Sequence, residues 1–341
     1  MQRVKSWCGA LSALAMGVLA YGAMAEDNKT QDKALIMKLA TATLNDGQHE
    51  WMKRFAVAIE KNTAGRIKAE VYPASQLGAI PRMIEGTQLG SIQMWVGPPE
   101  FLVGVDQRYE LLSVPGLLQS EQHAVKTAAD PDFAKTFLAV GLNKGLIGAG
   151  LFIGGPAAFV TRAPFRTLDD LRGKKIRVLA SPFQMEQMTR LGATGIPLSL
   201  GDVLPALQVG TLDGALGAVQ VFTALGYYDT TKYMNETGHA YVFSVIALSK
   251  RWFDMLPGDL QGTMLTTAKV IEQEVTPWEL DFLARQRKTW VEKGGELIVL
   301  SGAERMELMR KMGTVGNDIV RSKPGLKPLW DRLIATAKRS L

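Results

Sequence analysis

The sequence contains few of the residues from which enzymes build reactive sites. Its 341 residues include one cysteine and three histidines. The cysteine, Cys8, lies in an N-terminal segment that we expect to be removed, and the residues before it do not form a lipid-attachment box. A chain of this length can bury enough apolar surface to fold without disulfides. We therefore predict a mature chain with neither disulfide bonds nor thiol chemistry.

Catalytic and metal-binding motifs are also missing. The sequence has no H-E-x-x-H, no G-x-S-x-G, no P-loop and no G-x-G-x-x-G after a predicted strand. His49, His123 and His239 are far apart, and no run of acidic residues resembles a calcium loop. These absences favour a protein that is not an enzyme and that uses neither a metal nor a cofactor.

The sequence has only a slight excess of positive charge. Lysine and arginine number 39 and the acidic residues 33, which gives a formal net charge of +6. Basic and acidic residues alternate along the chain and form no basic stripe, so the sequence argues against nucleic-acid binding. The mild positive excess is compatible with the attraction of small anions.

No hydrophobic run is long enough to predict a membrane-spanning helix. Residues Ala10 to Ala20 are apolar, but the run is shorter than the ~20 residues that a bilayer requires. The run follows Arg3 and Lys5 and precedes Ala23-Met24-Ala25, which is the pattern of a signal peptide. We expect cleavage after Ala25 and export of the mature chain to the periplasm.

A second stretch of low charge, from Val140 to Val160, predicts sheet structure. Lys144, Pro156 and six glycines interrupt it. This pattern indicates a buried strand from Leu146 to Ile153 followed by a turn, and it argues against a transmembrane helix.

Apolar periodicity predicts two α/β units. After a strand and an Asn45-Asp46-Gly47 turn, Trp51, Phe55 and Ile59 recur at four-residue spacing and give a helix one apolar face. Short strands that alternate with helices predict a sheet with helices on its faces. The expected strands are 34–43, 66–72, 92–96, 175–179 and 212–216, and the expected helices are 80–89, 182–191 and 201–209.

The C-terminal third of the sequence is predominantly helical. From about Asp259 to Lys293 the pattern predicts an unusually long helix or helix pair, which Pro277 should kink or split. A helical segment of this length cannot bury itself on one small domain, so we expect it to run along both units. Amphipathic helices are expected at 302–320 and 329–341, with a break at Lys323-Pro324-Gly325.

Arg177 is a candidate binding residue. In the predicted strand, Ile176 and Val178 point to one face and Arg177 to the other. A guanidinium near the carboxyl end of a strand opens into the crevice where α/β sheets bind ligands, and its planar fork matches a carboxylate. The residues alone leave open the alternative of an edge-strand arginine in water.

Each histidine has a structural alternative to a binding role. His49 lies in the first turn of a predicted helix, where it is either a ligand contact or a capping residue. His123 follows a predicted helix start and is expected to be structural. His239 lies between two apolar runs, and a role in a hinge or a cleft stays open.

Several segments together resemble the solute-binding proteins of tripartite ATP-independent periplasmic (TRAP) transporters, of the dicarboxylate-binding type. The similarity covers nearly all of the mature sequence. The segments that carry it are residues 49–55, 63–67, 71–78, 84–92, 114–118 with 123–124, 167–178, 206–214 and 252–257.

The resemblance implies an α/β fold of two lobes, each with a mixed sheet flanked by helices, joined by a hinge and a long helix that crosses both. Lobe I would comprise residues 26–154 and about 243–282, and lobe II residues 155–242 and about 283–341. The resemblance also implies that Arg177 clamps the ligand carboxylate. The other ligand positions that it implies are Thr43, Asn45, Trp95, Ser181, Leu200, Gly217 and His239.

Departures from the family pattern bear on the ligand. This chain has Gly217, Ala157 and Pro98 where sialic-acid-binding members carry an asparagine, a second arginine and a glutamate. A polyhydroxylated sugar acid is therefore not expected. A set of large side chains favours a monocarboxylate with an apolar or aromatic tail, although some of them are expected to be core: Leu200, Trp95, Phe222, Tyr227 and Tyr228.

The function that the resemblance implies is capture of a small organic anion and its delivery to TRAP membrane subunits by a monomeric protein. The mechanism would be closure of two lobes over the ligand. Two alternatives remain at this point: a ligand-sensing module for a signalling receptor, and a periplasmic enzyme on a similar scaffold. The second would need a paired acid and base in the cleft, which the sequence does not reveal.

Overall fold

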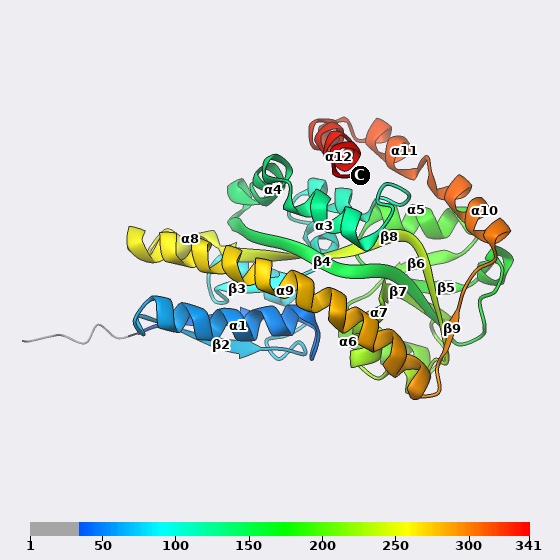
Figure 1. Cartoon of the computed structure of the whole chain (residues 1–341), viewed down its shortest axis with the longest axis horizontal. Helices are drawn as coiled ribbons and strands as arrows, with labels where there is room; N and C mark the ends of the chain where they lie inside the picture. The colour runs from blue at the N-terminus through cyan, green and yellow to red at the C-terminus, as the bar shows by residue number, and fades with distance from the viewer. Residues whose placement is uncertain (1–33) are drawn as a thin grey trace, which may run out of the picture. The chain divides into compact units, whose positions relative to one another are not determined.

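A single mixed sheet of nine strands organises the fold. The strand order is β2-β1-β3-β8-β4-β7-β5-β6, with β9 beside β8. The computed structural model describes residues 34–341, which form one compact unit (Figure 1). The predicted signal peptide, its cleavage site and Cys8 lie outside the described residues.

The first part of the sheet follows the predicted α/β pattern. β1 (Leu35–Ala40) pairs in parallel with β2 (Ile67–Tyr72) and with β3 (Met94–Gly97). The connecting helices are α1 (Gly47–Asn62) and α2 (Ile80–Leu89). α1 forms as predicted because its apolar stripe is fully buried, with the rings of Trp51 and Phe55 stacked 4.8 Å apart.

The second part repeats this arrangement. β5 (Lys175–Val178) pairs in parallel with β6 (Thr194–Pro197) and β7 (Gly214–Ala218). The helices α5 (Pro182–Arg190) and α6 (Leu200–Gln208) confirm the predicted spans to within a residue. α7 (Val219–Ala224) follows β7 directly and was not predicted.

Two long strands join these parts. β4 (Leu146–Thr161) and β8 (Tyr233–Ser249) run antiparallel to each other, and they also pair with β7 and β3 respectively. The predicted turn after Ile153 is wrong, since β4 continues through Gly154 and Gly155. The chain bends there within the sheet, because Gly155 adopts a φ of +102° and the β4–β8 register shifts between Ile153 and Gly155.

The long C-terminal helix is α9 (Gly258–Glu292), which is one continuous helix of 35 residues. Pro277 lies inside it, so the expectation of a split was wrong. Contacts with α1, β4, α7 and β9 (Glu296–Ile298) hold the turns on both sides of the proline. Figure 1 shows α9 extending along the sheet from α1 to β9, as the length of the pattern predicted.

The helices α3 (Glu121–Ala129), α4 (Pro131–Leu138), α10 (Gly302–Met312), α11 (Val315–Ser322) and α12 (Lys327–Ser340) contribute their buried side chains to the cluster on the face of the sheet opposite α1 and α9. The predicted helix 302–320 is in fact two, α10 and α11, which are separated at Gly313 and Thr314. α12 packs on α3 and α4. The short helices are α8 (Lys250–Phe253) and the 3-10 turns η1 (Pro99–Leu102), η2 (Gln107–Ser113), η3 (Leu142–Lys144), η4 (Leu168–Leu171), η5 (Tyr227–Asp229) and η6 (Pro324–Leu326).

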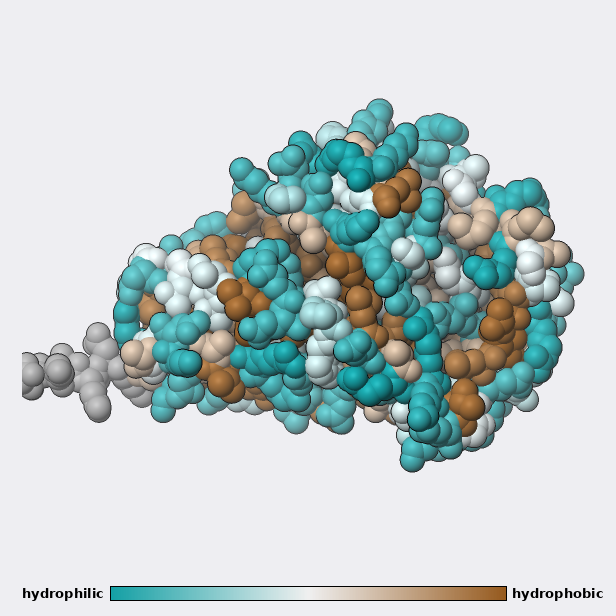
Figure 2. Space-filling view, in the orientation of Figure 1, coloured by the Kyte–Doolittle hydropathy of each residue, from teal (hydrophilic) through white to brown (hydrophobic). Residues whose placement is uncertain are grey.

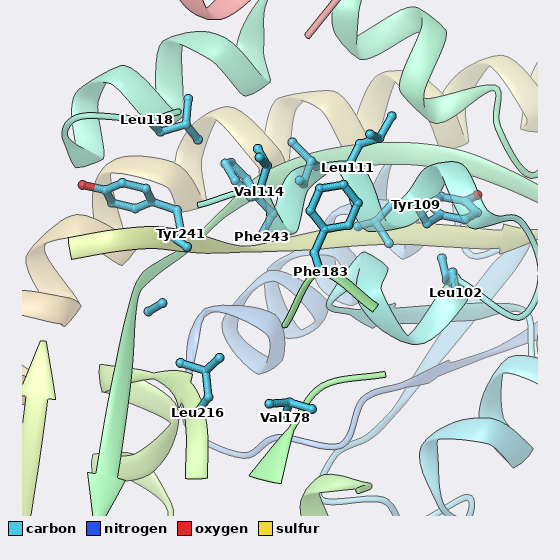
Figure 3. Close-up of a cluster of buried hydrophobic side chains, with 14 of the residues drawn as sticks. Leu102, Tyr109, Leu111, Val114, Leu118, Val178, Phe183, Leu216, Tyr241 and Phe243 are labelled. Atoms are coloured by element: carbon cyan, nitrogen blue, oxygen red, sulfur yellow. The ribbon is translucent and has the colours of Figure 1, made fainter. Parts of the chain in front are cut away.

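Buried apolar side chains form three clusters. One lies between α1, α9 and the first strands, and another lies between α6, α7, α9 and β7. The largest cluster combines side chains from both predicted lobes, such as Leu102 and Phe183 (Figure 3). The division into two lobes therefore stays a prediction at this point.

The described surface is that of an ordinary globular chain. On the face shown in Figure 2, hydrophilic side chains predominate, and hydrophobic ones lie among them in short stretches. Within residues 34–341, every helix is too short or too polar to cross a bilayer.

Close packing of β4 against α4 yields a test of the fold. A methyl group at Gly148 would lie 2.6 Å from the backbone oxygen of Leu138. At Gly262, an exposed position of α9, a methyl group would meet no atom outside its own helix segment within 4 Å. We expect Gly148→Ala to lower the free energy of unfolding by about 1–3 kcal/mol. Gly262→Ala should raise it by about 0.5–1 kcal/mol. Denaturant unfolding measures both, and equal effects would contradict the packing described for β4.

Candidate functional site

A cavity lies at the carboxyl ends of the parallel strands, where α/β sheets place their ligands. Its volume is about 40 Å³, which is room for a few water molecules. The lining comes from the β1–α1 loop, α2, β3, η1, the two long strands, the β5–β7 region, α7 and α9. The lining residues are Ala42, Thr43, Asp46, Gln48, Ile80, Trp95, Val96, Gly97, Pro98, Phe101, Gly154, Arg177, Leu179, Leu200, Gly217, Ala218, Gln220, Val221, Val242, Ser244 and Glu279.

Arg177 is the one basic side chain in this lining. β5 lies between β6 and β7, and Arg177 is only 2% exposed, so the alternative of an edge-strand arginine in water is wrong. Nε donates to the carbonyl oxygen of Leu198 at 2.9 Å and Nη1 to that of Leu216 at 3.0 Å. These two bonds fix the plane of the guanidinium and leave Nη2 without a hydrogen bond among residues 34–341.

The Arg177 charge has no ion-pair partner in the described part of the chain. Burial lowers its pKa to about 10, an effect that the nearby Tyr227 and Glu100 oppose, so the group is still cationic at neutral pH. Glu100 accepts a hydrogen bond from Ser113 at 2.8 Å, and burial raises its pKa to about 7. The guanidinium is therefore a desolvated cation that lacks a full counter-charge, which is the requirement for a buried anion site.

Apolar side chains surround the guanidinium. The ring of Phe101 lies 5.8 Å from Cζ of Arg177, and Trp95, Leu179 and Leu200 also line the cavity. Gly217 belongs to this wall as well, but its lack of a side chain has a packing reason. A methyl group there would lie 2.8 Å from the ring of Phe222.

A second wall of the cavity is polar and acidic. Asp46 caps α1 and accepts a hydrogen bond from Thr43 at 2.8 Å, and Glu279 on α9 accepts one from Gln220 at 2.7 Å. Burial raises the pKa of Asp46 to about 6, against the effect of Thr43. Burial and then the charge of Asp46 raise the pKa of Glu279 to about 8. This wall thus contains two carboxyl groups and no cation.

Five of the eight predicted binding residues meet in this cavity: Thr43, Trp95, Arg177, Leu200 and Gly217. The other three lie outside its lining. Asn45 is exposed and donates its backbone N–H to His49, and Ser181 is buried ahead of α5. His239 is buried in β8 and does not line the cavity.

The three histidines have structural environments. The backbone N–H of His49 donates to the Asp46 carboxylate, which is the capping arrangement. His123 bonds the carbonyl oxygen of Ala337 at 2.7 Å and ties α3 to α12, as expected for a structural residue. His239 is 1% exposed and bonds Gln187 at 3.1 Å, and burial lowers its pKa to about 4, so it is neutral.

Sequence reasoning missed several lining residues, namely Asp46, Gln48, Phe101, Gln220 and Glu279. Phe101 and Gln220 follow the ends of β3 and β7, so the strand-end rule that singled out Arg177 could have found them. Asp46 was seen only as part of a turn. Nothing local marks Glu279, because it is one of many acidic residues on a long helix.

The acidic wall makes stability depend on pH. The Glu279 carboxyl holds its proton more tightly in the folded than in the unfolded chain. Its stabilising contribution is therefore complete below the unfolded-state pKa and is lost as the pH rises towards 8. Glu279→Gln cannot ionise, so its stability should exceed that of the wild type by an amount that grows to a few kcal/mol at about pH 9.

Thermal and denaturant unfolding at a series of pH values measure this difference. Glu274→Gln, at an exposed position on the same helix, controls for the change in net charge. A stability difference that is constant from acid to alkaline pH would show that Glu279 is not held protonated by its surroundings.

Comparisons with known proteins show the family and the fold of the chain. The family model "Bacterial extracellular solute-binding protein, family 7" matches residues 40–323. The 2,3-diketo-L-gulonate-binding periplasmic protein YiaO of Escherichia coli strain K12 is 29% identical over 230 residues, which cover 66% of this chain and 68% of that protein.

Solved structures share the fold. The sugar acid binding protein of Advenella mimigardefordensis in complex with galactonate matches with a TM-score of 0.86 and 22% identity, over 91% of this chain and 99% of that one. A TRAP periplasmic solute binding protein of Desulfovibrio salexigens with bound orotic acid matches with a TM-score of 0.85 and 21% identity, over 90% and 99%. These matches confirm the predicted α/β fold class.

Proposed function

Since the chain belongs to family 7 of the bacterial extracellular solute-binding proteins, which bind and deliver solutes and are not enzymes, we propose that its cavity is the solute site. Proteins of this kind bind small organic acids in the periplasm and deliver them to a TRAP membrane permease. In this chain we assign the carboxylate of the solute to Arg177. The other lining residues would then contact the rest of the solute.

The buried guanidinium carries this proposal. Nε and Nη1 are held by two backbone oxygens, so Nη2 and the second N–H of Nη1 are available donors. A carboxylate there would supply the missing counter-charge at low dielectric, where each charge-assisted hydrogen bond contributes about 1.5–3 kcal/mol. Lysine has no planar fork and could not keep both backbone bonds while it binds the anion.

The solute that we propose is a monocarboxylate with an apolar or aromatic body. A second carboxylate would find no second cation, because Arg177 is the one basic group in the described lining, and it would approach Asp46 and Glu279. Trp95, Phe101 and Leu200 provide apolar surface beside the guanidinium. Ala157 and Pro98, at positions where sialic-acid-binding members carry charged groups, support the same ligand class.

Entry of the solute requires the cavity to widen, because about 40 Å³ is less than an organic acid occupies. We propose the two lobes as the moving parts, with residues up to 154 and about 243–282 in one and the rest in the other. β4 and β8 would form the hinge, since the positive φ of Gly155 and two of the three register shifts between these strands lie where they pass from one lobe to the other. We also propose that the signal peptide directs export of the chain and is cleaved after Ala25.

Titration calorimetry against a panel of monocarboxylates tests the assignment. Arg177→Ala should weaken binding by about 2–5 kcal/mol, because it removes the cation that the carboxylate pairs with, and Arg177→Lys should not restore it fully. The control is Arg172→Ala, an exposed arginine outside the cavity. Unchanged affinity in folded Arg177→Ala would refute the carboxylate clamp.

A further inference from the structure

Three buried oxygen atoms of the acidic wall have no hydrogen-bond partner among the described residues. They are Oε1 of Gln220, Oγ of Ser244 and Oε2 of Glu279. These residues are 1%, 0% and 2% exposed, and all three line the cavity. Buried polar atoms without a partner are uncommon and costly, so three along one cavity wall indicate a group that they are arranged to bind.

Neighbouring contacts fix the orientation of these groups. The Gln220 amide nitrogen faces two acceptors, Oε1 of Glu279 and the carbonyl oxygen of Gly154, so the free amide atom is the oxygen. Gly47 and Gly155 leave the room that the free oxygens of Glu279 and Gln220 occupy, because a methyl group at either glycine would overlap with them. The free oxygens of Gln220 and Glu279 are therefore held in place by the fold.

The chemistry of this wall selects a hydrogen-bond donor. An amide oxygen can only accept, and hydroxyl and carboxyl oxygens can also accept. An ammonium group has three N–H donors and can therefore bond all three, whereas a hydroxyl group donates to one of them and can accept from the Ser244 hydroxyl. Asp46 adds a second carboxyl group beside Glu279, and no basic side chain lines this wall. Among the described residues, Arg177 donates to the backbone oxygens of Leu198 and Leu216, whereas Gln220 and Glu279 bond each other, so the two groups belong to different hydrogen-bond networks.

We infer that Gln220, Ser244 and Glu279 form a second recognition point, which binds a hydroxyl or ammonium group at the end of the solute remote from its carboxylate. The inference rests on the proposed function, since it takes the carboxylate to be bound at Arg177. It extends that function by specifying the solute as an acid with an apolar body and a polar, hydrogen-bond-donating tip.

Matched synthetic acids test the inference. The probes are pentanoate, 5-hydroxypentanoate and 5-aminopentanoate, together with their shorter and longer homologues, titrated calorimetrically into the full mature chain. At the best chain length, one donor-ended acid should bind about tenfold tighter than the methyl-ended acid, which is the usual effect of one additional charge-assisted hydrogen bond. Comparison of the hydroxyl-ended acid with the amino-ended acid shows whether the group that donates the hydrogen bond is a hydroxyl or an ammonium.

Two variants assign the interaction to this wall. If the tip is ammonium, Glu279→Gln should remove most of the tenfold preference, because glutamine, unlike the carboxyl group, cannot release a proton and become the counter-charge of a bound ammonium group. If the tip is hydroxyl, Ser244→Ala should reduce the preference several-fold while Glu279→Gln largely keeps it, since glutamine still offers an acceptor. Glu272→Gln is the matched control, because Glu272 is buried on the same helix, bonds Leu151 and Lys269, and lies outside the cavity.

The outcomes separate this inference from the proposed function. If the methyl-ended acid binds as tightly as both donor-ended acids while Arg177→Ala still abolishes binding, the second recognition point is refuted and the clamp stands. A preference that survives both Glu279→Gln and Ser244→Ala would also refute it. If Arg177→Ala leaves the binding of every acid unchanged, the proposed function itself fails.

Discussion

The site depends on one desolvated positive charge. Arg177 is enclosed by apolar side chains and by two backbone oxygens that orient it, and no described carboxylate pairs with it. An arrangement of this kind destabilises the folded chain, and the proposed binding of an anion would offset that cost. The low dielectric that makes the charge costly also makes its attraction for a carboxylate strong.

The sheet explains why the cavity has two unlike walls. The parallel pairs β1–β3 and β5–β7 run in opposite directions and bring their carboxyl ends to one place, where Trp95, Arg177 and Gly217 lie in the strands themselves and Thr43 in the loop after β1. α9 adds Glu279 from the side, next to the first turn of α1. A cation at one wall and carboxyl groups at the other give the cavity a polarity, so the proposed solute would have one favourable orientation.

Sequence patterns predicted what depends on local order. The apolar stripe of Trp51, Phe55 and Ile59 predicted α1. The alternation of side chains along the strand predicted the face to which Arg177 points. Both patterns depend only on residues that are close in sequence. The acidic wall could not be predicted, since Asp46, Gln220 and Glu279 are brought together only by tertiary packing. The predicted turn at Gly155 and a split of α9 at Pro277 were wrong, because packing lets β4 bend without ending and keeps α9 continuous through the proline.

The strand order also constrains how the chain acquires its structure. On the side away from β1, β3 pairs with β8. The ribosome synthesises the paired segment of β8, Val245–Leu248, long after Met94–Gly97 of β3. The early strands therefore keep an unpaired edge until most of the polypeptide is present, and α12 must arrive last to cover α3 and α4. Such non-local pairing slows folding and exposes intermediates to aggregation. Truncation near the C-terminus should accordingly damage parts of the molecule that are made first.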